Sequence, residues 1–331
     1  MKRNIWDIPC YAQMPDPHFM VEINDGTGDF EVPVLLLPEE ILSKRLRRQS
    51  VRVYVFLGFM APPGNIKRIP AGYMIDKAFE TGLILSGDTV VEMTSGNMGV
   101  SLAFCAKNYG IRVVAIVSDS LPPGKLLPLQ RHGAEVVKES EAIIALGFER
   151  SPGSIVLTGK YAEKIGGVFL NQYGHPWNPE SYAVRVAPQL WEGIGEEASL
   201  FVSAVGSTGT LLGLGRYFKE RCPRIVTIAT MPYLGQNIDG TRDEKRLEEI
   251  SHDWRSLNPI EEPIDEITAR AVSAKLNENG IPAGPSSGAA LGTAEHYLLT
   301  RLARGELDEM RGGDGAINVI LPFADTLYPY G

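Results

Sequence analysis

The sequence predicts an α/β protein built on parallel strands, and three observations lead to this. Short β-branched and aliphatic runs, such as VRVYVFL at 51–57 and SLFVSAVG at 199–206, alternate with segments of helical length. These runs are apolar throughout, which is typical of parallel strands covered on both faces. Several helical segments follow proline or small residues and end at glycine, as helix starts and stops do.

The expected elements follow one another from residue 51 to the carboxyl end. Strands are predicted at 51–57, 88–93, 112–118, 134–139, 166–171, 199–206, 224–230 and 315–322. Helices are predicted at 69–84, 97–110, 123–133, 179–194, 210–222, 265–280 and 289–307. The segment 233–262 carries turn residues and mixed charge, so we expect a surface excursion there. No long-period repeat occurs, which excludes a solenoid.

Size and charge exclude several classes of protein. A chain of 331 residues predicts one large domain or two lobes with a cleft between them. A net charge of -8 without a basic stripe argues against a nucleic-acid partner. No run of about 18 apolar residues and no signal-peptide core is present, so we expect a cytoplasmic protein without membrane contact.

The metal-binding residue types are sparse. Cys10, Cys105 and Cys222 are too scattered for a disulfide framework or a paired metal site. The five histidines show no ligand spacing, so no metal is predicted.

Three turns of small residues stand where expected strands or connectors lead into helices. They are TSGN at 94–97, GSTGT at 206–210 and GPSSGAA at 284–290. The backbone N–H groups and helix dipole at such turns favour an anion, although each turn alone could be only a helix cap. GSTGT is the strongest, because its two glycines let the backbone close around a phosphate. No lysine follows its last glycine, so it is not a Walker A motif.

Three polar turns suit a ligand with several distinct ends, such as pyridoxal phosphate carrying an amino-acid substrate. Its aldehyde needs a lysine, its phosphate needs a nest of N–H groups, and its ring oxygen and ring nitrogen each need a partner. The substrate carboxylate needs donors of its own.

Four segments in order resemble the cysteine synthase and cystathionine β-synthase group of pyridoxal-phosphate enzymes, which have the tryptophan synthase β-type fold (fold type II). They are residues 62–119, LNQYGHPWNPESY, SAVGSTGTLLGLGRYFKE and GIPAGPSSGAA. The likeness runs from about residue 52 to the end. It implies a two-lobed α/β fold, with a smaller lobe at 55–170 and a larger lobe combining 1–54 and 171–331. It also implies a homodimer, by analogy only.

The same resemblance implies the site residues. Lys67 is the expected Schiff-base lysine and catalytic base, Asn97 the partner of the ring hydroxyl oxygen, and Ser286 the partner of the pyridine nitrogen. The phosphate is expected at Gly206, Ser207, Thr208, Gly209 and Thr210. The substrate is expected at Thr94, Ser95, Gly96, Asn97, Met98 and Gln172.

Ser286 bears on the reaction type. A neutral hydroxyl does not keep the pyridine nitrogen protonated as a carboxylate would, so the ring is a milder electron sink. Such a sink suits removal of the α-proton by Lys67 together with loss of a β-substituent, which gives an aminoacrylate.

The first functional prediction is therefore β-replacement on an O-activated L-serine, in which a nucleophilic co-substrate such as sulfide, a thiol or an amine adds to the aminoacrylate. The alternative is a lyase, which hydrolyses the aminoacrylate to pyruvate and ammonia or dehydrates a hydroxyamino acid. A third hypothesis is a catalytically silent binding paralogue, against which the presence of Lys67 argues.

Three residues depart from the pattern of the group. Asn65 replaces a serine, Arg68 replaces an acid, and Met98 replaces the threonine of TSGNTG. Because these changes lie near the expected substrate side, we expect conserved cofactor chemistry with an unusual substrate pair.

Overall fold

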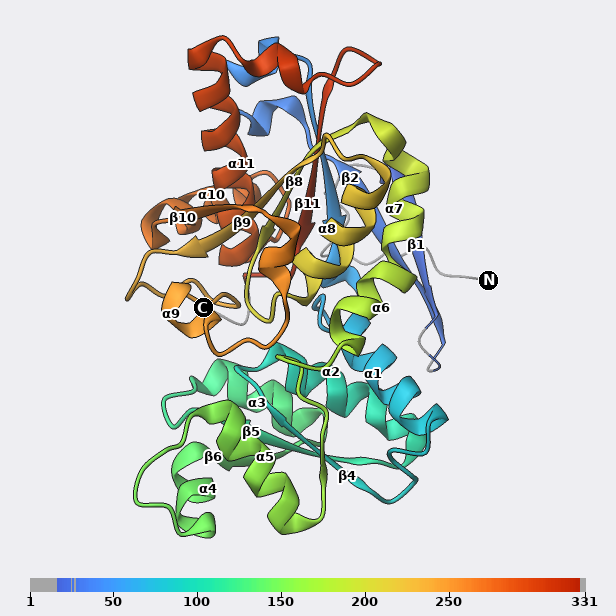
Figure 1. Cartoon of the computed structure of the whole chain (residues 1–331), viewed down its shortest axis with the longest axis vertical. Helices are drawn as coiled ribbons and strands as arrows, with labels where there is room; N and C mark the ends of the chain where they lie inside the picture. The colour runs from blue at the N-terminus through green and yellow to red at the C-terminus, as the bar shows by residue number, and fades with distance from the viewer. Residues whose placement is uncertain (1–16, 25, 27, 328–331) are drawn as a thin grey trace.

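Two helix-covered sheets organise the chain in the computed structural model (Figure 1), which describes residues 17–24, 26 and 28–327. The strands are β1 (Phe19–Asn24), β2 (Asp29–Leu36), β3 (Val51–Leu57), β4 (Thr89–Met93), β5 (Arg112–Val117), β6 (Glu135–Lys138), β7 (Val168–Phe169), β8 (Ala198–Ala204), β9 (Val226–Pro232), β10 (Ile260–Ile264) and β11 (Ile317–Phe323). The α-helices are α1 (Arg68–Glu80), α2 (Asn97–Ala106), α3 (Pro123–Arg131), α4 (Glu139–Leu146), α5 (Ser154–Ile165), α6 (Trp177–Arg185), α7 (Ala187–Ile194), α8 (Gly209–Arg221), α9 (Glu244–Leu247), α10 (Glu266–Glu278) and α11 (Pro285–Arg304).

The larger sheet has seven strands in the order β1-β2-β3-β11-β8-β9-β10. The five strands from β3 to β10 in that order run parallel, whereas β1 and β2 pair antiparallel at one edge. Parallel strands joined by helices confirm the predicted α/β class. The sequence did not predict β1, β2 or β10; β10 is an edge strand carrying Pro263 and two glutamates, a composition that strands usually avoid.

Side chains alternate across the larger sheet between two hydrophobic layers. Tyr54 and Phe56 of β3 face the core built with α6, α7 and α8. Val53 and Val55 of the same strand face the core built with α10 and α11. Because both faces are covered, an unbroken apolar run is the sequence that such a strand requires.

The smaller sheet has four parallel strands in the order β6-β5-β4-β7. Helices α1, α2 and α3 cover one face, and α4 and α5 cover the other (Figure 1). The sequence did not predict α4 and α5, which place few side chains in the core, among them Ala142, Leu157 and Ala162. None of the helices in the described residues is long and apolar enough to cross a membrane.

One predicted helix is divided. The segment 179–194 forms parts of α6 and α7, which meet at Val186, where the backbone leaves helical geometry at φ -122°. Pro188 stands in the first turn of α7 and has no N–H to continue the hydrogen bonds of α6.

The predicted division into lobes at residues 55 and 170 stays a prediction. β3 crosses the first boundary, and its pairing with β11 continues to Leu57. The second boundary follows the end of β7 at Phe169.

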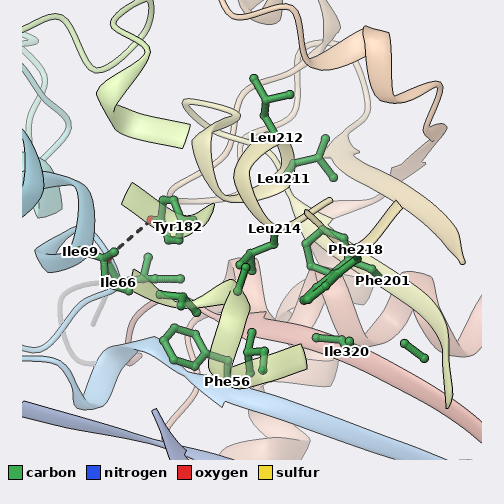
Figure 2. Packing of buried hydrophobic residues seen from close by; sticks show 14 of the residues in the cluster. Phe56, Ile66, Ile69, Tyr182, Phe201, Leu211, Leu212, Leu214, Phe218 and Ile320 are labelled. Atoms are coloured by element: carbon green, nitrogen blue, oxygen red, sulfur yellow. Dashed lines mark hydrogen bonds between the residues drawn. The ribbon is translucent and has the colours of Figure 1, made fainter. Parts of the chain in front are cut away.

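Helix α1 connects the two cores. Ile66, just before the helix, and Ile69, in its first turn, pack with Tyr182 and Phe56 in the core of the larger sheet (Figure 2). The Tyr182 hydroxyl donates a hydrogen bond to the carbonyl oxygen of Ile66 at 3.4 Å. Further along, Ile75 is buried in the core of the smaller sheet. Lys67 directly follows the first of these isoleucine anchors and is thereby held near the junction of the sheets.

The two ends of α1 provide a test of this packing. Ile69→Ala and Ile75→Ala each remove a fully buried side chain, so we expect each to lower the free energy of unfolding by about 2–5 kcal/mol. Denaturant titration monitored by circular dichroism measures this loss. Ile267→Ala, at an exposed position of α10, is the control and is expected to change stability by less than about 0.5 kcal/mol. A loss that small for Ile69→Ala would contradict the anchoring.

Candidate active site

A cavity lies where strands of the larger sheet end. Because β3, β8 and β11 run parallel, the loops after their carboxyl ends lie at the same edge of the sheet. The cavity is lined by predicted site residues from four separate parts of the chain, together with Asp325 and Gly240. The predicted residues are Lys67, Asn97, Gly206, Ser207, Thr208, Thr210 and Ser286.

Lys67 precedes α1, and its backbone is held by Asn65. The Asn65 Oδ1 atom accepts hydrogen bonds from the Lys67 N–H at 3.0 Å and from the Ser101 hydroxyl at 2.9 Å. The Lys67 Nζ atom donates to Ser207 Oγ at 3.4 Å. Burial of the amine, partly opposed by the charge of Asp325, lowers the pKa of Lys67 to about 8. A larger share of this amine is therefore neutral near pH 7.5 than of an ordinary lysine.

The turn at 206–210, predicted to bind the phosphate and named the phosphate loop below, requires its glycines. A Cβ at position 206 would lie 2.3 Å from the Gly240 carbonyl oxygen, and a Cβ at position 209 would lie 2.0 Å from Asn178 Oδ1. Thr208 between them adopts a left-handed φ of 64°, which non-glycine residues rarely adopt. The loop leads directly into α8, so the first N–H groups of that helix have no carbonyl partner within it. This cradle has the shape and polarity that a phosphate needs.

Two residues that sequence reasoning missed support the phosphate loop from behind. Asn178 Nδ2 donates to Ser207 Oγ at 3.0 Å and to the Gln172 carbonyl oxygen at 2.6 Å. The Nδ1 atom of His252 lies 3.0 Å from the Ser207 carbonyl oxygen, and burial lowers the pKa of this imidazole. His252 comes from the segment 233–262, whose irregular sequence carries no signal for this role.

Ser286 lies in the first turn of α11 and lines the cavity. Its hydroxyl is buried, and it has no hydrogen-bond partner within the described residues. A buried hydroxyl without a partner is costly, so a ligand atom that bonds it would be stabilising. Together with the glycine cradle at 206–209, this hydroxyl gives the cavity the groups that pyridoxal phosphate requires, so the residues present fit the cofactor.

The turn at 94–97 is organised by its own threonine. Thr94 Oγ1 accepts hydrogen bonds from the N–H groups of Gly96 at 3.0 Å and Gly99 at 3.1 Å, so this hydroxyl caps the start of α2. Gly96 has a φ of 135°, which favours glycine, and Ser95 is exposed. Asn97 turns its side chain to the cavity and donates from Nδ2 to Asp325 Oδ2 at 2.7 Å.

Of the six predicted substrate residues, Asn97 alone lines the cavity; the five that do not are Thr94, Ser95, Gly96, Met98 and Gln172. Gln172 donates from Nε2 to the Met93 carbonyl oxygen at 3.0 Å. Met98 is 2% exposed and packs in the core of the smaller sheet. Their contact with a substrate stays a prediction, and their positions do not add support to it. The other two departures, Asn65 and Arg68, are buried as well, so any influence of these three departures on substrate choice is indirect.

Asp325 is the most important site residue that sequence reasoning missed. It is 1% exposed, lines the cavity and follows β11, the last strand of the parallel set. The available signal was its position, because an acid just beyond the carboxyl end of a predicted parallel strand lies at the ligand-binding edge of the sheet.

Other chemistry-bearing groups lie away from the cavity. Within the described residues, no group of three or more His, Cys, Asp or Glu side chains could hold a metal ion. Cys105 and Cys222 are buried free thiols, and Cys10 lies outside the described residues. Glu92, on the strand before the 94–97 turn, is fully buried, and this burial raises its pKa to about 8.

A lysine facing a phosphate loop, in a cavity at the junction of two α/β sheets, is the arrangement of a fold type II pyridoxal-phosphate enzyme. The chain belongs to the family described as "Pyridoxal-phosphate dependent enzyme", whose model matches residues 32–309. The predicted cofactor and the predicted family resemblance are therefore confirmed.

The chain is similar to several enzymes of this family. The chain is 32% identical over 233 residues to "Cysteine synthase B" of Pseudomonas aeruginosa, across 70% of this chain and 75% of that protein. The solved "O-acetylserine dependent cystathionine beta-synthase from Helicobacter pylori" is 27% identical, with a TM-score of 0.71 over 90% of this chain and 94% of that one. "O-ureido-L-serine synthase", at 24% identity, shares the fold with a TM-score of 0.73 over 100% of this chain and 93% of that one.

The lowered pKa of Lys67 predicts how the cofactor-free protein takes up pyridoxal phosphate. Attachment requires the neutral amine, whose share rises from about one tenth at pH 7 to about nine tenths at pH 9 when the pKa is about 8. We expect the attachment rate to rise about tenfold over this range and then to level off. The visible absorption of the lysine-bound cofactor, followed by stopped flow, measures the rate.

Matched variants control this experiment. Lys67→Ala is expected to abolish attachment, whereas Lys77→Ala, on the exposed part of the same helix, leaves the rate profile unchanged. A rate that still rises tenfold for each pH unit up to pH 10 would show an ordinary lysine and contradict the effect of burial.

Proposed function

We propose that the protein catalyses β-replacement on an O-activated L-serine, in which a nucleophilic co-substrate takes the place of the leaving group. The coarser statement, replacement or elimination at the β-carbon of a serine derivative, is supported by the relatives named as cysteine synthase and as O-acetylserine dependent cystathionine β-synthase.

The observation that carries the proposal is the pairing of Lys67 with Ser286 in one cavity. Pyridoxal phosphate, when bound, withdraws electrons from the α-carbon of an attached amino acid. Ser286 presents a neutral hydroxyl at the expected ring nitrogen, so that this withdrawal is moderate. Moderate withdrawal favours reactions in which the α-proton and a β-substituent leave together, over decarboxylation or transamination.

Lys67 has the properties of the base in this reaction. With a pKa of about 8, about a quarter of its amine is neutral at pH 7.5, compared with about one in a thousand for an ordinary lysine. Its Nζ atom is held beside Ser207, at the phosphate end of the cavity. From this position Lys67 takes the proton from the α-carbon of the substrate and returns it to the product.

The substrate carboxylate is proposed to bind at the 94–97 turn. The backbone bends here through Gly96, and α2 begins at Asn97, so N–H groups of the first helical turn other than that of Gly99, which Thr94 binds, can meet an anion. Thr94 holds the shape of the turn through its two backbone contacts. The exposed hydroxyl of Ser95 adds a donor at the mouth of the turn.

A panel of serine derivatives separates replacement from elimination. The purified holoenzyme is incubated with O-acetyl-L-serine, O-phospho-L-serine or L-serine, each with and without sulfide, cysteine, homocysteine or a primary amine. We expect one pair to give a new amino acid by mass spectrometry, with pyruvate formation reduced at least about tenfold when the nucleophile is present. Pyruvate released at an undiminished rate with every nucleophile would overturn replacement and favour elimination.

A further inference from the structure

A buried carboxylate, that of Asp325, lines the cavity and contacts the 94–97 turn. Asp325 Oδ2 accepts a hydrogen bond from Asn97 Nδ2 at 2.7 Å. The backbone of Asp325 pairs with Asn65 in an antiparallel bridge, and its carbonyl oxygen accepts from the Gly284 N–H at 2.9 Å. This one residue therefore contacts the loop of Lys67, the turn of Asn97 and the start of the helix that carries Ser286.

The neighbouring backbone makes room for the carboxylate. A Cβ at position 284 would lie 2.4 Å from Asp325 Oδ1, so the carboxylate occupies space that only a glycine leaves free. The residue before it, Ala324, accepts from the Ile66 N–H at 2.7 Å. The position of the Asp325 side chain is thus set by backbone contacts on both sides and does not depend on a flexible loop.

Charge in the cavity is limited to two residues. Among the described residues that line it, Lys67 and Asp325 are the only ionisable side chains. His252 lies behind the phosphate loop, and its burial favours the neutral imidazole. The Asp325 charge raises the pKa of Lys67 against the larger effect of burial. The cavity therefore pairs one cation with one anion.

We propose that Asp325 is a positioning residue for the cofactor: its carboxylate orients the amide of Asn97 toward the ring oxygen and supplies the negative charge that faces Lys67. A carboxylate only accepts hydrogen bonds, so it selects the nitrogen of the amide and excludes the flipped rotamer. The amide nitrogen has two N–H groups. One is bound to Asp325, and the second is left for the ring oxygen of pyridoxal phosphate.

The proposal rests on the cofactor site, including the proposed role of Asn97, and is independent of the choice between replacement and elimination. It is therefore tested without substrate, by two measurements on the purified protein. The first is the pH titration of the visible band of lysine-bound pyridoxal phosphate. The second is the dissociation constant of pyridoxal phosphate, from equilibrium titration of the cofactor-free protein.

Asp325→Asn keeps a hydrogen-bond acceptor of nearly the same shape and removes the charge. Loss of a nearby negative charge destabilises the protonated form of the lysine–cofactor link, so the midpoint of the titration is expected to fall by at least about one pH unit. Asp314→Asn is the matched control, because Asp314 precedes the same strand at its far end and pairs with Arg52 on the surface. It is expected to leave both measurements unchanged.

Asp325→Ala removes the acceptor as well, and tests the orientation of Asn97. We expect its dissociation constant for pyridoxal phosphate to be at least about tenfold larger than that of the wild type. It is also expected to be larger than that of Asp325→Asn. In an Asn97→Ala background the same change is expected to alter the constant by less than about twofold, because the amide that it orients is gone.

The outcomes decide clearly. An unchanged titration midpoint in Asp325→Asn overturns the electrostatic role, and an equal loss of affinity from Asp325→Ala with and without Asn97 overturns the orienting role. Thermal unfolding confirms that each variant is folded; should Asp325→Ala fail to fold, the nearly isosteric Asp325→Asn decides alone. Failure of the wild-type protein to bind pyridoxal phosphate would instead contradict the assignment of the cofactor site itself. That result is distinct from loss of the electrostatic or the orienting role of Asp325.

Discussion

The structure depends on the packing of two isoleucines around a lysine. Ile66 and Ile69 are buried against Phe56 and Tyr182 of the larger core, and this contact fixes the chain just before α1. The same helix then enters the core of the smaller sheet at Ile75. Lys67 lies where the chain passes from one core to the other, so the hydrophobic interior of both sheets determines where its amine can reach. The chemistry of the cavity follows from that placement.

Burial and charge act in opposite directions on this amine. Enclosure in the protein favours the neutral form, whereas Asp325 favours the protonated form, and enclosure is the larger effect. The outcome is an amine that changes protonation near neutral pH, where a base that both takes up and returns a proton works best. The hydroxyls of Ser207 and Ser286 also line the cavity but add no charge. The ionisable side chains of the lining are therefore those of Lys67 and Asp325.

Sequence reasoning located the elements with regular patterns and missed those that depend on tertiary contacts. Apolar runs predicted the parallel strands, and small-residue turns predicted three anion-binding turns, of which 206–210 was the strongest phosphate candidate. The roles of Lys67, Asn97 and Ser286 came from the family resemblance. Asn178, His252 and Asp325 could not be found in this way, because each is a common polar residue whose partners are distant in the chain: His252, for example, contacts Ser207 across 45 residues. Met98 illustrates a second difficulty. A departure in a binding motif suggested a substrate contact, which stays a prediction, and the side chain at this helical position packs in a core.

The hydrogen bond between Asn97 and Asp325 joins parts of the chain that belong to different sheets. Asn97 follows β4 of the smaller sheet, whereas Asp325 follows β11 of the larger one. The ion pair of Lys125 with Asp239 likewise joins α3, on the smaller sheet, to the loop after β9 of the larger one. Any hinge motion that separated the sheets at this edge would have to break both contacts. The hydrogen bond proposed to orient Asn97 therefore also joins the two sheets, so separating them at this edge would release the Asn97 amide.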